Sequence, residues 1–201
     1  MEIENQHPVH ARIATNLRAL RAARTMSLET LAQASGVSRS ALSLIERGQS
    51  SPTAVVLDKI AVGLGVSLAD LFASKFSASA EMPTPLSRQV DQVCWTDPGS
   101  GYVRRALSPV GFASPIQLVE VHFPPGARVA FETGPRNGNV HQQVWILQGQ
   151  LTLTVGSASW NLQAGDCLAM TLDQPTAFHN PSRQTTRYLV ALATDATSRK
   201  N

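Results

Sequence analysis

Cysteine is scarce in this chain of 201 residues: Cys94 and Cys167 are the two present, and they form no CxxC pair. Two thiols are too few for a disulfide framework, so a reducing cytoplasm fits best. The sequence has no run of about 18 apolar residues, which excludes a transmembrane helix. Its first residues, MEIENQHPVHAR, lack the apolar core of a signal peptide. We therefore expect a cytoplasmic protein without a membrane partner.

The composition is that of a globular protein with a weak basic excess. Hydrophobic residues make up 43% and charged residues 15%, which argues against a chain disordered throughout. The net charge is +3, and six arginines fall within the first 50 residues. On charge alone, a solvated basic face and a surface for an anionic partner both remain open.

Two regions that differ in composition and in hydrophobic periodicity indicate two domains. Residues 9–73 are rich in Ala, Leu, Ser and Arg at helical spacing, whereas residues 93–193 contain Val, Thr and Leu in period-2 alternation. The Ser-, Ala- and Pro-containing stretch between them predicts a linker over 74–92. Residues 194–201 are expected to form a flexible tail.

The first region predicts five short helices. The apolar stripe of Ile13, Leu17, Leu20 and Ala23 predicts a helix over about 9–24. Capping residues and glycines delimit the others. The expected limits are Ser27 to Gly36, Ser38 to Gly48, Ser51 or Thr53 to the glycines at 63 and 65, and a last turn after Ser67.

The stretch LETLAQASGVSRSALSLIERG (28–48) is the most specific signal in the sequence. Two short helices joined by a Gly-containing turn leave one face of the second helix free for the major groove of DNA. Arg can pair with guanine, and hydroxyls can contact base edges or phosphates. The candidate DNA-binding residues are Ser38, Arg39, Ser40, Ser43, Arg47, Ser50 and Thr53.

Residues 13–72 resemble the helix-turn-helix domain of the Cro/repressor-like (XRE-type) regulators. The resemblance covers the whole stretch from LRALRAARTMSLETLAQ to GVSLADLF. It implies a five-helix, lambda-repressor-like fold that binds a double-stranded DNA operator as a homodimer. It also implies a buried structural ion pair between Arg21 and Glu46, which would fix helix orientation more than it adds stability.

The second region predicts an all-β domain. QLVEVHF (117–123) and RYLVALA (187–193) alternate as strands, and 144–156 holds two strands separated by Gly149. SASWNL (157–162) follows a tight turn and predicts a hairpin, and another strand follows Gly165. Many short strands at regular spacing indicate a sandwich or a barrel.

Residues 101–193 resemble the cupin fold, a double-stranded β-helix or jelly-roll barrel. The matching stretches are FPPGARV (123–129), QVWILQGQLTLTVG (143–156), LQAGDCLAMTL (162–172) and FHN (178–180). Metal-binding cupins use two His and a Glu in a first motif and one His in a second. Here His179 matches the second motif, but Gln142 replaces the Glu and PRNG (135–138) has no His. We therefore expect no metal and no cofactor.

Small barrels can still hold one small ligand without a metal. The candidate ligand-binding residues are Arg128, His141, Gln142, Trp145 and His179. Arg128 could pair with a ligand carboxylate. A packing role for each of these residues, or a surface role for Arg128, is the alternative.

Three functions fit these observations. The first is a transcriptional regulator whose cupin domain senses a small-molecule effector, promotes dimerisation, or both. The alternative is a cupin isomerase or dioxygenase that carries a DNA-binding domain, but the sequence shows no catalytic residues. In the third, the β domain serves only to dimerise. We expect a regulator without enzymatic activity.

Overall fold

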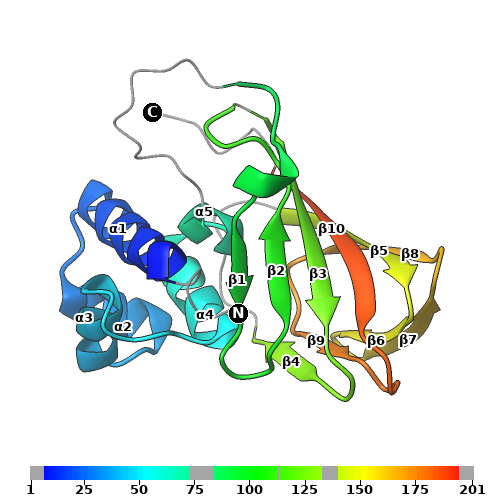
Figure 1. The fold of residues 1–201 in the computed structure, drawn as a ribbon. Helices are drawn as coiled ribbons and strands as arrows, with labels where there is room; N and C mark the ends of the chain where they lie inside the picture. Colours follow the sequence, from blue (N-terminus) through cyan, green and yellow to red (C-terminus); the bar gives the residue numbers. More distant parts are fainter. Residues whose placement is uncertain (1–6, 73–83, 113, 133–139, 195–201) are drawn as a thin grey trace.

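A computed structural model describes residues 7–72, 84–112, 114–132 and 140–194. It shows a helical domain followed by a domain of two packed sheets (Figure 1), which confirms the predicted fold class. Residues 74–83 of the predicted linker and 195–201 of the predicted tail lie outside the described residues. The helices are α1 (His7–Ala23), α2 (Leu28–Ser35), α3 (Arg39–Glu46), α4 (Ala54–Leu64) and α5 (Leu68–Phe72).

Short polar side chains begin helices α2, α3 and α4. The hydroxyls of Ser27, Ser38 and Thr53 accept hydrogen bonds from backbone N–H groups in the first turns that follow. These bonds satisfy donors that a helix cannot pair internally. Helix α4 begins after Thr53, one of the two predicted caps.

The glycine prediction for α4 was wrong at Gly63, which lies inside the helix; α4 ends at Gly65 in the left-handed conformation. A Cβ atom on Gly63 would lie 2.9 Å from the Cβ atom of Ser35 in α2. Gly63 therefore allows the backbones of α2 and α4 to approach closely.

The second domain contains ten strands among the described residues. They are β1 (Cys94–Thr96), β2 (Val103–Ala106), β3 (Ile116–Phe123), β4 (Arg128–Phe131), β5 (Val140–Gln148), β6 (Gln150–Val155), β7 (Ala158–Gln163), β8 (Cys167–Thr171), β9 (Thr176–His179) and β10 (Thr186–Thr194). A short 3-10 turn (Gln89–Asp91) precedes them. The sequence analysis did not predict β1, β2, β4 or β9, which have three or four residues each.

All strand pairs are antiparallel, in two sheets ordered β1-β2-β3-β10-β5-β8 and β4-β9-β6-β7. From β3 to β10 the chain passes back and forth between the sheets, which is the jelly-roll arrangement of the cupin fold. Strand β5 shows the alternation clearly. Gln142, Val144 and Ile146 are buried toward the barrel interior, whereas His141 and Trp145 are exposed on the outer face.

The helical domain packs against the barrel through α4 and α5 (Figure 1). The ring of Phe72 lies 5.4 Å from the ring of Trp95 in β1. The carboxylate of Asp97, in the β1–β2 loop, accepts a 2.8 Å hydrogen bond from the backbone N–H of Ala54 at the start of α4. Strands β1 and β2 therefore connect the barrel to the helices.

Candidate DNA-binding surface and barrel cavity

Helices α2 and α3 form the predicted helix-turn-helix. Helix α2 ends at Gly36, whose φ of 67° reverses the chain, and Ser38 then caps α3. Leu42 and Ile45 turn inward and are 0% and 3% exposed. The strong segregation of apolar and polar residues along α3 leaves its other face to the solvent.

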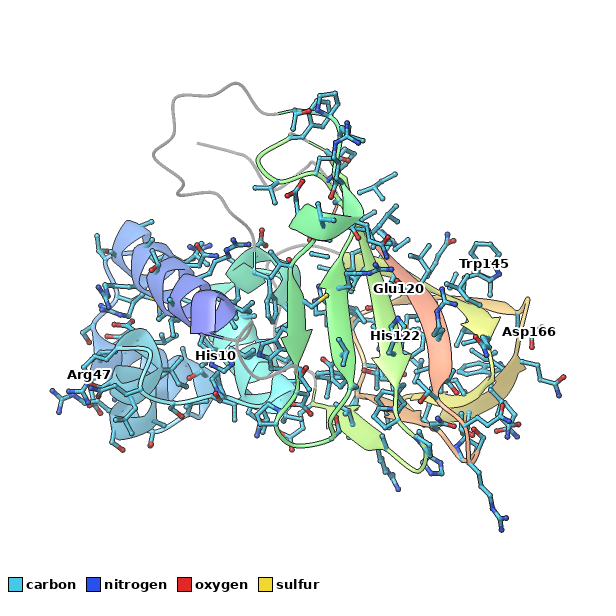
Figure 2. All side chains as sticks on the ribbon, viewed as in Figure 1. His10, Arg47, Glu120, His122, Trp145 and Asp166 are labelled. Atoms are coloured by element: carbon cyan, nitrogen blue, oxygen red, sulfur yellow. The ribbon has the colours of Figure 1, made fainter. Side chains whose placement is uncertain are left out.

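The predicted DNA-binding residues on α3 and at its ends lie on this open side. Arg39, Ser40 and Arg47 are exposed, and Ser43 is half-buried. Ser38 is also exposed, but its hydroxyl is already 3.2 Å from the backbone N–H of Ala41 as the helix cap. Figure 2 shows Arg47 at the end of the helical domain away from the barrel.

Two further predicted residues follow α3. Ser50 is half-buried in the loop between α3 and α4. Thr53 caps α4, and its methyl group would lie 3.2 Å from a Cβ atom on Gly99 in the β1–β2 loop. Thr53 therefore lies at the contact between the domains, whereas the residues of α3 lie away from it.

The predicted ion pair between Arg21 and Glu46 is present. Two bonds join the side chains, Nε to Oε1 at 2.6 Å and Nη2 to Oε2 at 2.9 Å. Arg21 also donates to the carbonyl of Met26, and Arg18 donates to the carbonyl of Glu46. The hydrogen bond with Glu46 raises the pKa of Arg21 above its ordinary value, against the effect of burial. The pair connects α1 to the end of α3.

A cavity of about 80 Å³ lies inside the barrel, next to the helical domain. This space is large enough for several water molecules or one small organic molecule. Most of its wall is apolar and comes from both sheets. Three residues of the helical domain, Asp58, Ser67 and Leu68, complete the wall.

The five predicted ligand residues separate in the structure. Gln142 is buried and lines the cavity. His141 and Trp145 are exposed on the outer face of the larger sheet, and Arg128 is exposed on β4. His179 lies opposite Arg128 in the β4–β9 pair, and it alternates with the inward-facing Phe178. Of the five predicted ligand residues, Gln142 is therefore the one that lines the described cavity.

Arg104 is a cavity residue that the sequence analysis missed. It is 8% exposed, lies on β2 and has its guanidinium carbon 5.3 Å from the centre of the Phe72 ring. Burial lowers its pKa, because the charged form is poorly solvated there. The sequence feature that could have revealed Arg104 is the dipeptide Arg104-Arg105, because one of two adjacent arginines in a strand must face inward.

Arg105 points to the outer face, where it pairs with the buried carboxylate of Glu120. Arg187 of β10 donates to the same carboxylate at 2.8 Å. Burial alone would raise the pKa of Glu120, but these hydrogen bonds outweigh it and the pKa falls below its ordinary value. Glu120 and the adjacent His122 are labelled on β3 in Figure 2.

The outer face of the larger sheet also has a shallow apolar hollow. Trp145 is 47% exposed and borders this hollow, together with side chains from β5, β8 and β10. The other lining residues are Gln143, Cys167, Leu189 and Ala191. A large aromatic side chain in an apolar hollow is typical of a protein contact surface.

The donor set of the cavity does not fit the metal site of metal-binding cupins. Its described walls contain one carboxylate, Asp58, and no imidazole. Within the described ranges, no group of three or more His, Cys, Asp or Glu side chains is placed to hold a metal ion. The PRNG stretch at 135–138 lies outside the described residues. Among the residues that the structure describes, no helix is long and apolar enough to cross a membrane.

Comparison with known proteins agrees with this architecture. The model of the helix-turn-helix family (HTH_3) matches residues 17–71. The chain is 29% identical over 176 residues to the HTH-type transcriptional regulator SutR of Escherichia coli K12, covering 88% of this chain and 91% of that protein. It is 27% identical to the HTH-type transcriptional regulator PuuR of the same organism, with 87% and 91% covered.

A solved structure extends the similarity to both domains. The crystal structure of an HTH_3 family transcriptional regulator from Vibrio cholerae superposes with a TM-score of 0.72 and 25% identity, over 92% of this chain and 96% of the other. This chain is a DNA-binding transcriptional regulator with an N-terminal helical domain and a C-terminal cupin barrel. Its N-terminal domain is a helix-turn-helix domain of the XRE type.

Proposed function

We propose that this regulator binds an operator in double-stranded DNA as a homodimer in the cytoplasm, and that a small-molecule effector in the barrel changes its affinity for the operator. The observation that carries the proposal is the position of α3. Its apolar face is buried, Arg39, Ser40 and Arg47 are exposed, and Figure 2 shows Arg47 at the end of the helical domain away from the barrel. Helix α3 can therefore enter a major groove while the barrel stays in place.

The residues around α3 divide into two roles. Arg39 and Ser40 begin α3 and Ser43 lies one turn further along, so we assign these three residues to base edges, which the N-terminal part of a recognition helix contacts. Ser38, Arg47 and Ser50 contact phosphates at the ends of the helix. Thr53 contributes through its cap at the start of α4.

Selection of duplexes by the purified full-length protein, followed by anisotropy titrations at fixed salt, tests this proposal. Arg39→Ala should cost about 1–3 kcal/mol on the selected site and relax its preference at one base pair. Arg47→Ala should weaken all duplexes uniformly and reduce the salt dependence. Arg183→Met removes an exposed arginine of the barrel and is the matched control. Equal affinity for the selected duplex and a scrambled duplex would refute the proposal.

The position of the cavity supports an effector role for the barrel. Its walls include residues of α4 and of the segment leading into α5, so a bound molecule touches both domains. An effector changes DNA affinity only if it binds better to one domain arrangement than to another. A cavity closed by both domains meets that requirement, and Gln142 is the predicted ligand residue that we place there.

We propose that the barrel acts by binding rather than by catalysis. The described walls of the cavity contain no imidazole, and no group of three or more His, Cys, Asp or Glu side chains among the described residues is placed to hold a metal ion. Metal analysis of the purified protein discriminates between the alternatives. One tightly held metal ion per chain would favour the cupin enzyme instead.

The homodimer follows from the two-fold symmetry of operators, which a dimeric regulator matches with two recognition helices. We place its contact at the apolar hollow around Trp145 on the outer face of the larger sheet. This face lies on the barrel, so the contact leaves α3 accessible.

A further inference from the structure

The wall of the barrel cavity contains a positive charge that the described residues do not neutralise. Arg104 is buried, and its Nε–H group has no hydrogen-bond partner among the described residues. Its contact with the ring of Phe72 supplies no acceptor oxygen. A buried guanidinium without such acceptors is costly, because water solvated it in the unfolded chain.

Two carboxylates near the cavity, those of Asp97 and Glu120, are engaged elsewhere. Asp97 accepts from Ala54 and from Ser100. Glu120 faces the opposite side of the sheet, where two arginines surround it. Asp58 lines the cavity but has an interaction of its own. Within the described residues the Nε–H group of Arg104 has no acceptor, and a molecule in the cavity can supply one together with a negative charge.

The other residues of the cavity wall indicate the chemical character of the rest of the bound molecule. Apolar side chains dominate it, among them Val121, Val140, Phe178 and Leu192. Gln142 and Thr176 supply further polar groups, and both are buried. One cation in a small, mostly apolar cavity fits one anionic head with a short apolar tail.

We propose that the cavity binds a small organic monocarboxylate, whose carboxylate accepts hydrogen bonds from Arg104 and whose apolar part packs against the barrel walls. The assignment deepens the proposed function by naming the class of effector. Phe72 and Leu68 connect the ligand to the helical domain, since Phe72 contacts Arg104 and Leu68 lines the cavity. The monocarboxylate therefore favours the domain arrangement in which α5 closes the cavity.

Calorimetry and thermal melts of the full-length protein with monocarboxylates from acetate to benzoate test this proposal. Each acid is compared with its neutral amide and its amine at matched ionic strength, for example butanoate with butanamide and butylamine. We expect at least one acid to bind and raise the Tm. The matching amide should bind at least about tenfold more weakly, because it lacks the charge that Arg104 needs.

Arg104→Met is the decisive variant, with Arg183→Met as a control for the loss of one positive charge. We expect Arg104→Met to lose the response to the acid while keeping its far-ultraviolet circular dichroism spectrum, and Arg183→Met to keep the response. The comparison of acid with amide on the unaltered protein stays decisive if Arg104→Met does not fold.

Three results would overturn the site: no acid binds, amides or amines bind as tightly as acids, or Arg104→Met responds as the unaltered protein does. DNA selection on the same preparations separates this outcome from the proposed function. Operator binding without any acid response removes the carboxylate site alone. Acid binding without operator preference keeps the site and removes the operator proposal.

Discussion

A buried hydrogen bond from Ala54 to Asp97 joins the two domains directly. Ala54 is the first residue of α4, where the backbone N–H has no partner within the helix. Asp97, 3% exposed, supplies that partner from the barrel at 2.8 Å. Its second oxygen accepts from the N–H and hydroxyl of Ser100, which fixes the carboxylate in position.

We predict that Asp97→Ala destabilises the protein and weakens the coupling between its domains. A hydrogen bond to a charged group contributes about 1.5–3 kcal/mol. Ala54 is completely buried, so its N–H would lose its partner without gaining water. A loss of this size lowers the Tm by roughly 3–12 °C for a chain of this length. In calorimetry we also expect the barrel and the helical domain to unfold in two separate transitions.

Ser100→Ala is the matched control for this prediction. It removes the hydroxyl that donates to Asp97 but leaves the bond to Ala54 intact. We expect it to cost less stability than Asp97→Ala, because the N–H of Ser100 still donates to the carboxylate, and to preserve the unfolding behaviour of the unaltered protein. If both variants lose the same small amount of stability, the reasoning that Asp97 holds the domains together is refuted.

Three other predictions follow from buried charges and from the outer face. Removing either member of the pair Arg21–Glu46 should cost about 3–5 kcal/mol in urea unfolding, and Arg21→Met with Glu46→Leu should recover much of it; additive losses would contradict this. Because the folded-state pKa of Glu120 is depressed, its ion pairs stabilise the protein fully above the ordinary value of 4.5 and progressively less as pH falls below it. Glu120→Gln should therefore be less stable at neutral pH and flatten the acid limb of the stability curve, and an unchanged limb would argue against the role of its ion pairs. Trp145→Glu should shift the protein from dimer to monomer in light scattering, while the same change at the exposed Trp160 of β7 should not; a dimer that survives Trp145→Glu would place the contact elsewhere.

The helical domain could be predicted closely because its signals are local. Ser27 and Ser38 each accept a hydrogen bond from the N–H group three residues along, so the sequence alone marks where α2 and α3 begin. Local residue spacing also predicted which face of α3 is buried, with Leu42 pointing inward and Arg39 outward. Gly63 was misread because its role depends on Ser35, in another helix.

The cavity was harder to predict because it depends on which face of each strand points inward. Gln142 and His141 are adjacent, so a one-residue change in register exchanges their positions. Arg104 was missed because β2 has four residues and too little alternation to be recognised. Its environment is also set by Trp95 and Phe72, which come from another strand and another domain. No pattern within a single segment records such contacts.

Helix α4 determines how a change in the cavity can reach DNA. It contributes Asp58 to the cavity wall, and it packs against α2 at the close approach of Gly63 and Ser35. Because that contact leaves no space for sliding, a displacement of α4 moves α2 and α3 with it as one body. If the proposed effector binds, we therefore expect it to change the orientation of the whole helical domain and to leave the shape of α3 intact. In a dimer held by its barrels, such a rotation alters the distance between two recognition helices, which must match half-sites about 34 Å apart.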